Sequence, residues 1–242
     1  MARRIALALH GAGSDGAFAG RCFRADDLAV DSVVTVEHRD RGTHSLLTAI
    51  TRQIEAARSR GEAVALLAGV SLGAHAAAIW AARARDLAGL EGLLLVMPAW
   101  TGRPAHVAAA TEAAAREVTE LGSAAIIERL RAESPHDWVV GAMAESWPRY
   151  GDRLLAASLL SASGCAGPTA AELVAIPLPC AIVALDDDPL HPRAVAVRWH
   201  ELIARSALGV LPRDLGGGHT EAAPSTLGRA AMAALGSLSG SR

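Results

Sequence analysis

Short, nearly continuous runs of apolar residues recur along the chain, separated by longer segments in which apolar residues have helical spacing. Because parallel strands are buried on both faces, such runs predict strands of a parallel sheet. The expected strands are Ile5–Leu9, Val33–Val36, Val64–Ala68, Leu93–Met97, Ala181–Leu185 and a weaker Leu208–Leu211. The expected helices between them are Leu46–Arg58, Leu72–Arg85, Arg193–Arg205 and Thr226–Leu235. This alternation predicts an α/β fold with a mostly parallel sheet of about six strands flanked by helices.

One interval, from about Trp100 to Ile176, has no strand pattern. It is rich in Ala, Glu and Arg, and Gly and Pro divide it into expected helices over Pro104–Leu121, Ala124–Ala132, Asp137–Glu145 and Asp152–Leu160. A helical insertion at this point would lie over the carboxyl ends of the strands, where open α/β sheets bind ligands. The pattern therefore predicts a core of residues 1–99 and 177–242 and a helical insertion of residues 100–176.

Composition excludes several classes of protein. Of 242 residues, 51% are hydrophobic and 20% are charged, so a packed core is expected. The net charge is −2 without any basic run, which argues against nucleic-acid and membrane partners. The apolar run after Met1 is too short for a signal peptide, and three cysteines without a C-x-x-C pair indicate free thiols. We expect a cytoplasmic monomer or homodimer that acts on a small molecule.

The strongest chemical signal is Gly69-Val70-Ser71-Leu72-Gly73, which lies between an expected strand and an expected helix. In that context G-x-S-x-G describes a nucleophile elbow, a turn so sharp that the flanking residues must be small. Gly69 and Gly73 relieve the crowding, while the helix N-terminus beneath Ser71 favours developing negative charge. The alternative is an ordinary turn in which Ser71 caps the helix.

A second signal, His10-Gly11-Ala12-Gly13, follows the first expected strand. A bare backbone at this position can offer N–H groups to an oxyanion, and we assign this role to the N–H groups of Ala12 and Leu72. His10 is expected to support the loop by a hydrogen bond. The glycines also fit G-x-G-x-x-G, but the segment from Ser14 to Phe23 does not have the pattern of a helix with a free N-terminus, which argues against phosphate binding.

Acids and a histidine follow the last two expected strands. Asp186, Asp187 and Asp188 come directly after the fifth strand, at the edge where the serine is expected, and spacing alone does not choose among them. His219 follows a run of three glycines after the sixth strand. Serine, acid and histidine then occur in the chain order of a nucleophile-elbow triad, with His219 as general base. The other histidines are scattered and lack metal-ligand spacing, so no metal is expected.

These motifs together resemble α/β-hydrolase-fold enzymes of the small esterase and cofactor-free haloperoxidase-like kind. His10-Gly11 is similar to the oxyanion-loop HG of that family, and Gly218-His219 to its catalytic histidine. The segment Arg39–Ser45 is similar to its D-x-R-G-x-G-x-S loop, with His44 in place of a usual glycine. The loop Asp188-Pro189-Leu190-His191-Pro192 matches its acid loop, in which a proline follows four positions after the aspartate, and this favours Asp188.

The resemblance implies an ester or related acyl hydrolase with the triad Ser71, Asp188 and His219, no cofactor, and an insertion that acts as a cap. The chain departs from the family in two places. It begins almost at the family's third strand, so the first strands of the full sheet are expected to be missing, and Glu221 and Pro224 have a different spacing after the histidine. Thioester, lactone or carbon–carbon bond hydrolysis on the same triad, and ligand binding without turnover, remain alternatives.

Overall fold

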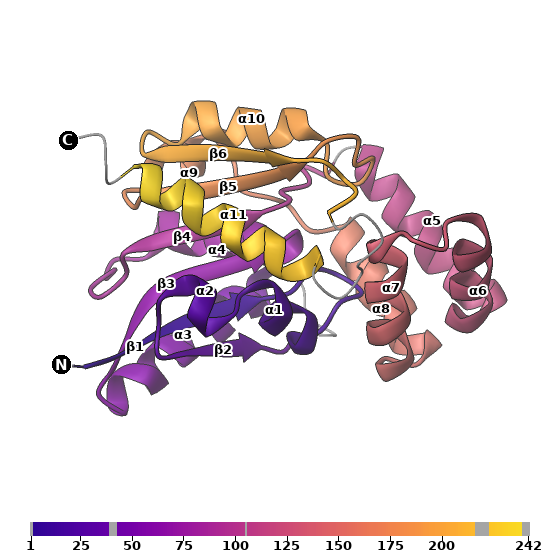
Figure 1. The fold of residues 1–242 in the computed structure, drawn as a ribbon, viewed down its shortest axis with the longest axis horizontal. Helices are drawn as coiled ribbons and strands as arrows, with labels where there is room; N and C mark the ends of the chain where they lie inside the picture. Colours follow the sequence, from indigo (N-terminus) through magenta and orange to yellow (C-terminus); the bar gives the residue numbers. More distant parts are fainter. Residues whose placement is uncertain (1, 39–42, 105, 216–222, 239–242) are drawn as a thin grey trace.

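A single parallel sheet forms the centre of the computed structural model, which describes residues 2–38, 43–104, 106–215 and 223–238 (Figure 1). Its strand order is β2-β1-β3-β4-β5-β6, and every neighbouring pair runs parallel. The strands are β1 (Arg3–Leu9), β2 (Ser32–Val36), β3 (Glu62–Val70), β4 (Gly92–Val96), β5 (Cys180–Leu185) and β6 (Ser206–Leu211). This arrangement confirms the predicted fold class.

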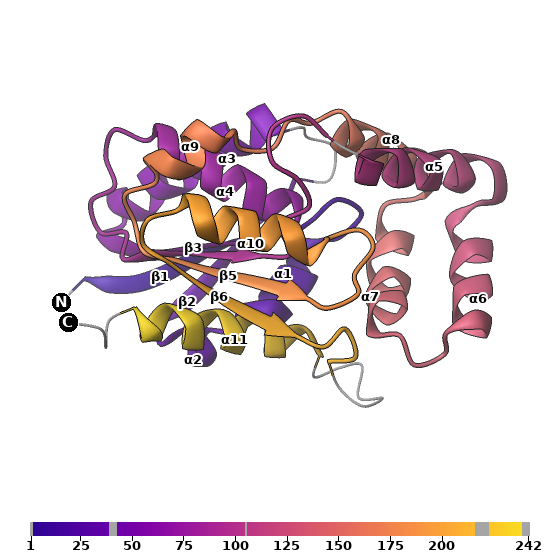
Figure 2. The same ribbon diagram turned by 90° about the horizontal axis from the view of Figure 1, so that it is seen from above.

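Helices cover both faces of this sheet (Figure 2). One face carries α3 (Thr43–Ser59), α4 (Leu72–Arg83), α9 (Ala170–Ala175) and α10 (Arg193–Leu202), and the other carries α1 (Gly16–Cys22), α2 (Ala25–Leu28) and α11 (Ala223–Ser237). Alternate residues of each buried strand enter two separate apolar clusters, as Leu7 and Ala8 of β1 do. The sheet is therefore buried on both sides, which explains why its strands have continuous apolar sequences.

The insertion forms α5 (His106–Leu121), α6 (Ser123–Glu133), α7 (Trp138–Ser146), the 3₁₀ turn Trp147–Arg149 and α8 (Asp152–Ser163). These helices extend beyond the carboxyl edge of the sheet and have an apolar cluster of their own (Figures 1 and 2). The two connections to the core are hydrogen-bonded to each other, because the N–H of Gly102 donates to the carbonyl of Pro168 and the N–H of Gly167 donates to that of Gly102.

Residues 14–23 contain a helix, α1 (Gly16–Cys22), but its N-terminus is not free, because Asp15 caps it. Its seven residues include two glycines, so intrinsic helix propensity is low. Two tertiary factors stabilise it instead. Asp15 caps the helix by accepting the N–H of Phe18, and Phe18, Ala19 and Cys22 are buried against the sheet.

Two further observations concern the chain as a whole. Within the described ranges no helix is long and apolar enough to cross a membrane. Cys22 and Cys180 are free thiols, and burial raises the pKa of each.

Candidate active site

Ser71 lies on a strained turn between the end of β3 and the start of α4. Its φ of 53° and ψ of −115° are unfavourable for a residue with a side chain. Glycine is required at both flanking positions, because neighbouring backbone atoms lie too close to leave room for a Cβ. A Cβ on Gly69 would lie 2.3 Å from the carbonyl of Gly73, and a Cβ on Gly73 would lie 2.6 Å from the carbonyl oxygen of Leu9. The predicted elbow geometry is therefore present around Ser71.

A hydrogen-bonded chain of three side chains begins at this serine. Ser71 Oγ lies 2.9 Å from Nε2 of His191, and Nδ1 of the same ring lies 3.0 Å from Oδ2 of Asp188. Because an ionised carboxylate only accepts, Nδ1 carries the proton that is donated to Asp188. Nε2 of His191 is then a free acceptor, placed to take the proton of the Ser71 hydroxyl.

Asp188 is held as an anion. Burial raises its pKa, but the hydrogen bond from His191, the charge of that ring and the N–H groups of Leu190 and His191 bring the pKa down to about 2. Both N–H groups donate to Oδ1, at 2.9 and 3.2 Å. The carboxylate is thus fixed at both oxygens, one by the loop backbone and one by the imidazole.

The neighbouring acids face elsewhere. Asp186 is half-exposed and pairs with Arg193 at 3.0 Å. Asp187 is exposed and has a φ of 58°. The positive φ of Asp187 turns the chain so that the following residue points back toward the serine. Of the three acids that the sequence left open, Asp188 is the one brought to the histidine and the serine.

His219, the predicted general base, lies outside the described residues. His191 lies in the predicted acid loop, and no role of its own was predicted for it from the sequence. The signal that pointed to His219, a histidine that follows the serine and the acid in chain order, fits His191 equally well. A histidine three residues after a strand-end aspartate, on the same loop, was the local signal for His191.

The predicted oxyanion loop lies beside Ser71. A Cβ on Gly11 would come within 3.1 Å of the Cβ of Ser71, and Ala12 and Leu72 line the same cavity as the serine. His10 is fully buried and its Nδ1 donates to the carbonyl of Gly11 at 2.8 Å. Since that carbonyl and the N–H of Ala12 share one planar peptide, His10 orients the N–H of Ala12.

A second histidine holds His10 in place. The rings of His10 and His38 stack with centroids 3.6 Å apart. The N–H of His38 donates to Nε2 of His10 at 3.3 Å, and Nε2 of His38 donates to the carbonyl of His10 at 2.8 Å. The backbone donor fixes His10 as a neutral ring with its proton on Nδ1.

A cavity of about 250 Å³ opens above Ser71 and His191. Its walls come from the oxyanion loop, from the residues after β4, and from α5, α7 and α8 of the insertion. Trp100, Trp138 and Trp147 all line it. The insertion and the core therefore enclose one site between them.

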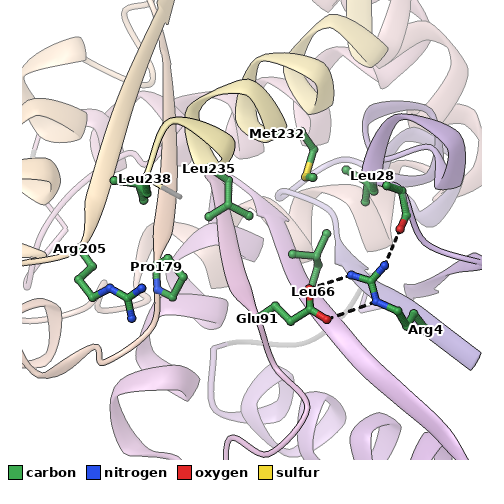
Figure 3. A pocket seen from close by; sticks show the side chains of 10 residues that line it. Arg4, Leu28, Leu66, Glu91, Pro179, Arg205, Met232, Leu235 and Leu238 are labelled. Carbon is green, nitrogen blue, oxygen red and sulfur yellow. Dashed lines mark hydrogen bonds and ion pairs between the residues drawn. The ribbon is translucent and has the colours of Figure 1, made fainter. Parts of the chain in front are cut away.

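A larger cavity, of about 460 Å³, lies at the opposite, amino edge of the sheet (Figure 3). Its best-placed cation, Arg4, is already bound by Glu91, at 2.7 and 3.3 Å, and by the carbonyl of Ala29 at 2.9 Å. None of its described lining residues is a serine, cysteine or histidine. The smaller cavity is therefore the one that holds a hydrogen-bonded serine, histidine and aspartate.

No metal centre is evident in the part of the chain that the structure describes, where no group of three or more His, Cys, Asp or Glu side chains could hold an ion. His75, one turn into α4, is fully buried, and its Nε2 accepts the N–H groups of Ala99 and Trp100 at 3.0 and 3.4 Å. It packs against Trp100 and Trp199. It connects the elbow helix to the segment that leads into the insertion.

Comparison with known proteins gives matches in structure alone. No protein-family model matches the sequence, and a search of the curated proteins finds no match. MenH from S. aureus is similar in structure with a TM-score of 0.71 at 15% identity, over 97% of this chain and 94% of that one. A thermophilic esterase from Thermogutta terrifontis gives 0.68 at 17%, over 98% and 91%. The enol-lactonase from Burkholderia xenovorans LB400 gives 0.67 at 16%, over 87% and 83%.

Proposed function

Because this chain has the α/β-hydrolase fold, with a serine, a histidine and an aspartate hydrogen-bonded at its carboxyl edge, we propose that it is a serine hydrolase of ester or related acyl bonds. Ser71 is the nucleophile, His191 the general base and Asp188 the acid that orients it. The observation that carries the proposal is the 2.9 Å contact between Ser71 Oγ and His191 Nε2, backed by the 3.0 Å contact to Asp188. Such a chain is what activates a weak hydroxyl nucleophile.

The reaction follows in two halves. His191 Nε2 takes the Ser71 proton as Oγ attacks the acyl carbon, and the N–H groups of Ala12 and Leu72 hold the resulting oxyanion. His191 then gives the proton to the leaving alkoxide, and an acyl ester remains on Ser71. In the second half His191 takes a proton from water, the hydroxide attacks the acyl carbon, and the acid leaves as Ser71 recovers its proton. The anionic Asp188 stabilises the imidazolium in both halves.

A fluorophosphonate probe, followed by intact-mass measurement and peptide mapping, tests this proposal. We expect a single adduct on Ser71, because the probe reacts with an activated serine and mimics the tetrahedral intermediate. Ser71→Ala should abolish the adduct, and Ser14→Ala, at another serine that lines the cavity, should leave it intact. Folded protein without any adduct would refute the proposal.

The same probe separates the two candidate bases. We expect His191→Gln to lower the labelling rate by roughly a thousandfold or more, and His219→Gln to leave it nearly unchanged. The reverse result would assign the base to His219, as the sequence predicted, and would give His191 a supporting role. Gln keeps the size and a polar end in each variant, so the comparison is matched.

Lactone hydrolysis is a second candidate. The structural similarity to the enol-lactonase favours it, and a cyclic ester needs the same serine, base and oxyanion donors. Hydrolysis of matched linear and cyclic esters, each compared with Ser71→Ala, distinguishes the two. A kcat/KM that is higher for the cyclic ester than for the linear ester would favour the lactonase.

A further inference from the structure

The walls of the cavity above Ser71 are almost entirely carbon. Among the described residues that line it, His191 alone has an ionisable side chain. The alanines Ala110 and Ala114 of α5, Ala142 of α7 and Ala162 of α8 provide part of the surface. Tryptophans and aliphatic side chains provide most of the rest. A group that enters this space therefore exchanges water for apolar surface.

Several polar atoms of the cavity wall are already hydrogen-bonded within the protein. Trp100 Nε1 donates to the carbonyl of Cys165 at 3.2 Å, and Trp138 Nε1 donates to that of Arg213 at 2.9 Å. The hydroxyl of Thr111 donates to the carbonyl of Val107 at 3.2 Å. These hydrogen bonds fix the shape of the wall, and Ser14 Oγ is a lining polar atom without a hydrogen-bond partner among the described residues.

A charged group is excluded by the same features. A carboxylate or phosphate placed in this cavity would lose its hydration without gaining a cation from the described walls, because none of the described lining residues is an arginine or a lysine. The arginines of the insertion lie on other surfaces, as Arg129 does, paired with Glu117. The described walls therefore favour a neutral group in this cavity.

The volume limits the size of that group. A cavity of about 250 Å³ is below the usual range of roughly 300–1,000 Å³ for drug-sized ligands. Since a water molecule takes about 30 Å³ of liquid, there is room for on the order of eight groups of methylene or water size. Short to medium aliphatic chains fill this space, and the far end of a longer chain would extend out of it.

We propose that this cavity binds a neutral aliphatic acyl group of roughly four to eight carbons, and that α5, through Ala110 and Ala114, sets the limit of its length. The inference rests on the proposed function, since it names the substrate class of the same site. Ala114 is half-buried and lines the cavity, whereas its neighbour Ala113 is exposed and does not. The chain thus offers a matched control one residue away.

Hydrolysis of p-nitrophenyl esters tests the substrate class. From acetate to butyrate to hexanoate, kcat/KM should rise about fourfold per methylene and then fall once the cavity is full. The hemisuccinate ester, which matches butyrate in backbone but ends in a carboxylate, should be poorer by roughly tenfold or more. Equal rates for butyrate and hemisuccinate, or no dependence on chain length, would overturn the proposal.

Two variants test the role of α5. Ala114→Phe should lower kcat/KM for hexanoate by about tenfold or more while acetate changes little, because the ring occupies volume that only the longer chain needs. Ala113→Phe should leave the preference unchanged. Ala110→Phe, at an exposed position on the cavity rim, gives the same test with less risk to packing. An unaltered hexanoate-to-acetate ratio in both lining variants would refute the assignment.

Binding without turnover separates this inference from the proposed function. Three tryptophans line the cavity, so their fluorescence in the Ser71→Ala protein reports occupancy. Ethyl hexanoate should shift the emission, and monoethyl succinate should not. Binding with this selectivity but without probe labelling of wild-type Ser71 would retain the cavity assignment and refute the hydrolase. Probe labelling of wild-type Ser71 without this binding selectivity would retain the proposed hydrolase and refute the cavity assignment.

Discussion

The two cavities at opposite edges of the sheet differ in what surrounds their polar groups. At the amino edge the larger cavity has Arg4 fully bound by Glu91 and a backbone carbonyl (Figure 3). At the carboxyl edge the smaller cavity has a serine whose hydroxyl meets a free acceptor, His191. Volume alone would have selected the wrong one. The hydrogen bonding of the polar side chains is the better guide to function: Arg4 is already bound at the amino edge, whereas Ser71 lies against a proton acceptor at the carboxyl edge.

Backbone strain is distributed in the same way. The non-glycine residues with positive φ in the described chain are Ala29, Ser71, Met97 and Asp187. Ala29 is the left-handed C-cap of a short helix, an ordinary helix ending. The other three follow β3, β4 and β5 within two residues, at the carboxyl edge. Strained backbone at consecutive strand ends is characteristic of a site that the rest of the fold holds in place.

The largest expected effect comes from Ser71→Ala, which removes the proposed nucleophile. On a substrate with a cleaved acyl bond, kcat should fall by a factor on the order of a million. Arg205→Ala, at the amino-edge cavity, should change kcat/KM by less than about twofold, because that residue is exposed and remote. Steady-state kinetics of both proteins measures the contrast. A large loss in Arg205→Ala would break the distinction between the two edges.

Asp188→Asn should have the next largest effect. An amide in place of the carboxylate favours the wrong tautomer of His191, so kcat should fall by roughly ten-thousand-fold. Asp187→Asn is the matched control, because Asp187 is exposed and asparagine tolerates its positive φ. Its kcat should stay within about twofold of wild type. Equal losses in the two variants would mean that the loop, and not the carboxylate of Asp188, was damaged.

The sheet was predictable because the burial of each strand determines the residue types of that strand alone. A strand buried on both faces must be apolar throughout, and β1 and β5 were therefore visible as runs. α1 was not, since its stability comes from Asp15 and from the surface it covers, neither of which a pattern over seven residues contains. The elbow was predictable because Gly69 and Gly73 flank Ser71 in sequence, although the backbone that requires glycine at position 73 is that of Leu9 in β1.

The histidine shows where sequence reasoning ends. Chain order and a strand-end position are shared by His191 and His219, so neither criterion can choose between them. Which imidazole reaches Ser71 Oγ depends on the path of the β5–α10 loop, where the positive φ of Asp187 turns Asp188 inward and brings His191 after it. That path is a tertiary property of the loop, and a list of residue types does not contain it.

A buried polar group at the carboxyl edge should affect stability with a definite pH dependence. Burial, and then the charge of His191, lower the pKa of His75 to about 3, and its Nε2 accepts two backbone N–H groups. Its Nδ1 has no hydrogen-bond partner within the described structure. The unfolded chain binds a proton at this histidine below about pH 6.5, and the folded protein does not. Stability is therefore lost as the pH falls from 6.5 toward 3.

Urea unfolding of wild type and His75→Gln at pH 7 and pH 5 isolates this contribution. Because all other groups are common to both proteins, wild type should lose about 2 kcal/mol more than the variant over this range. The charge of His191 contributes to the lowered pKa of His75, so the same pair of proteins should also be compared with His191→Gln in both. Parallel losses in wild type and His75→Gln would show that His75 titrates normally in the folded protein.

The exposed ion pair at the amino edge should have the smallest effect. Arg4 and Glu91 meet at 2.7 Å, but their side chains are 44% and 57% exposed, so water screens the attraction and the ordered side chains lose entropy. A double-mutant cycle of Arg4→Ala and Glu91→Ala in urea unfolding should give a coupling free energy of about 0.2–1 kcal/mol. It should shrink further in 1 M salt, where the screening length is about 3 Å. A coupling several times larger and insensitive to salt would mean that this cavity is held as rigidly as the one above Ser71, and polar satisfaction would then no longer separate the two edges.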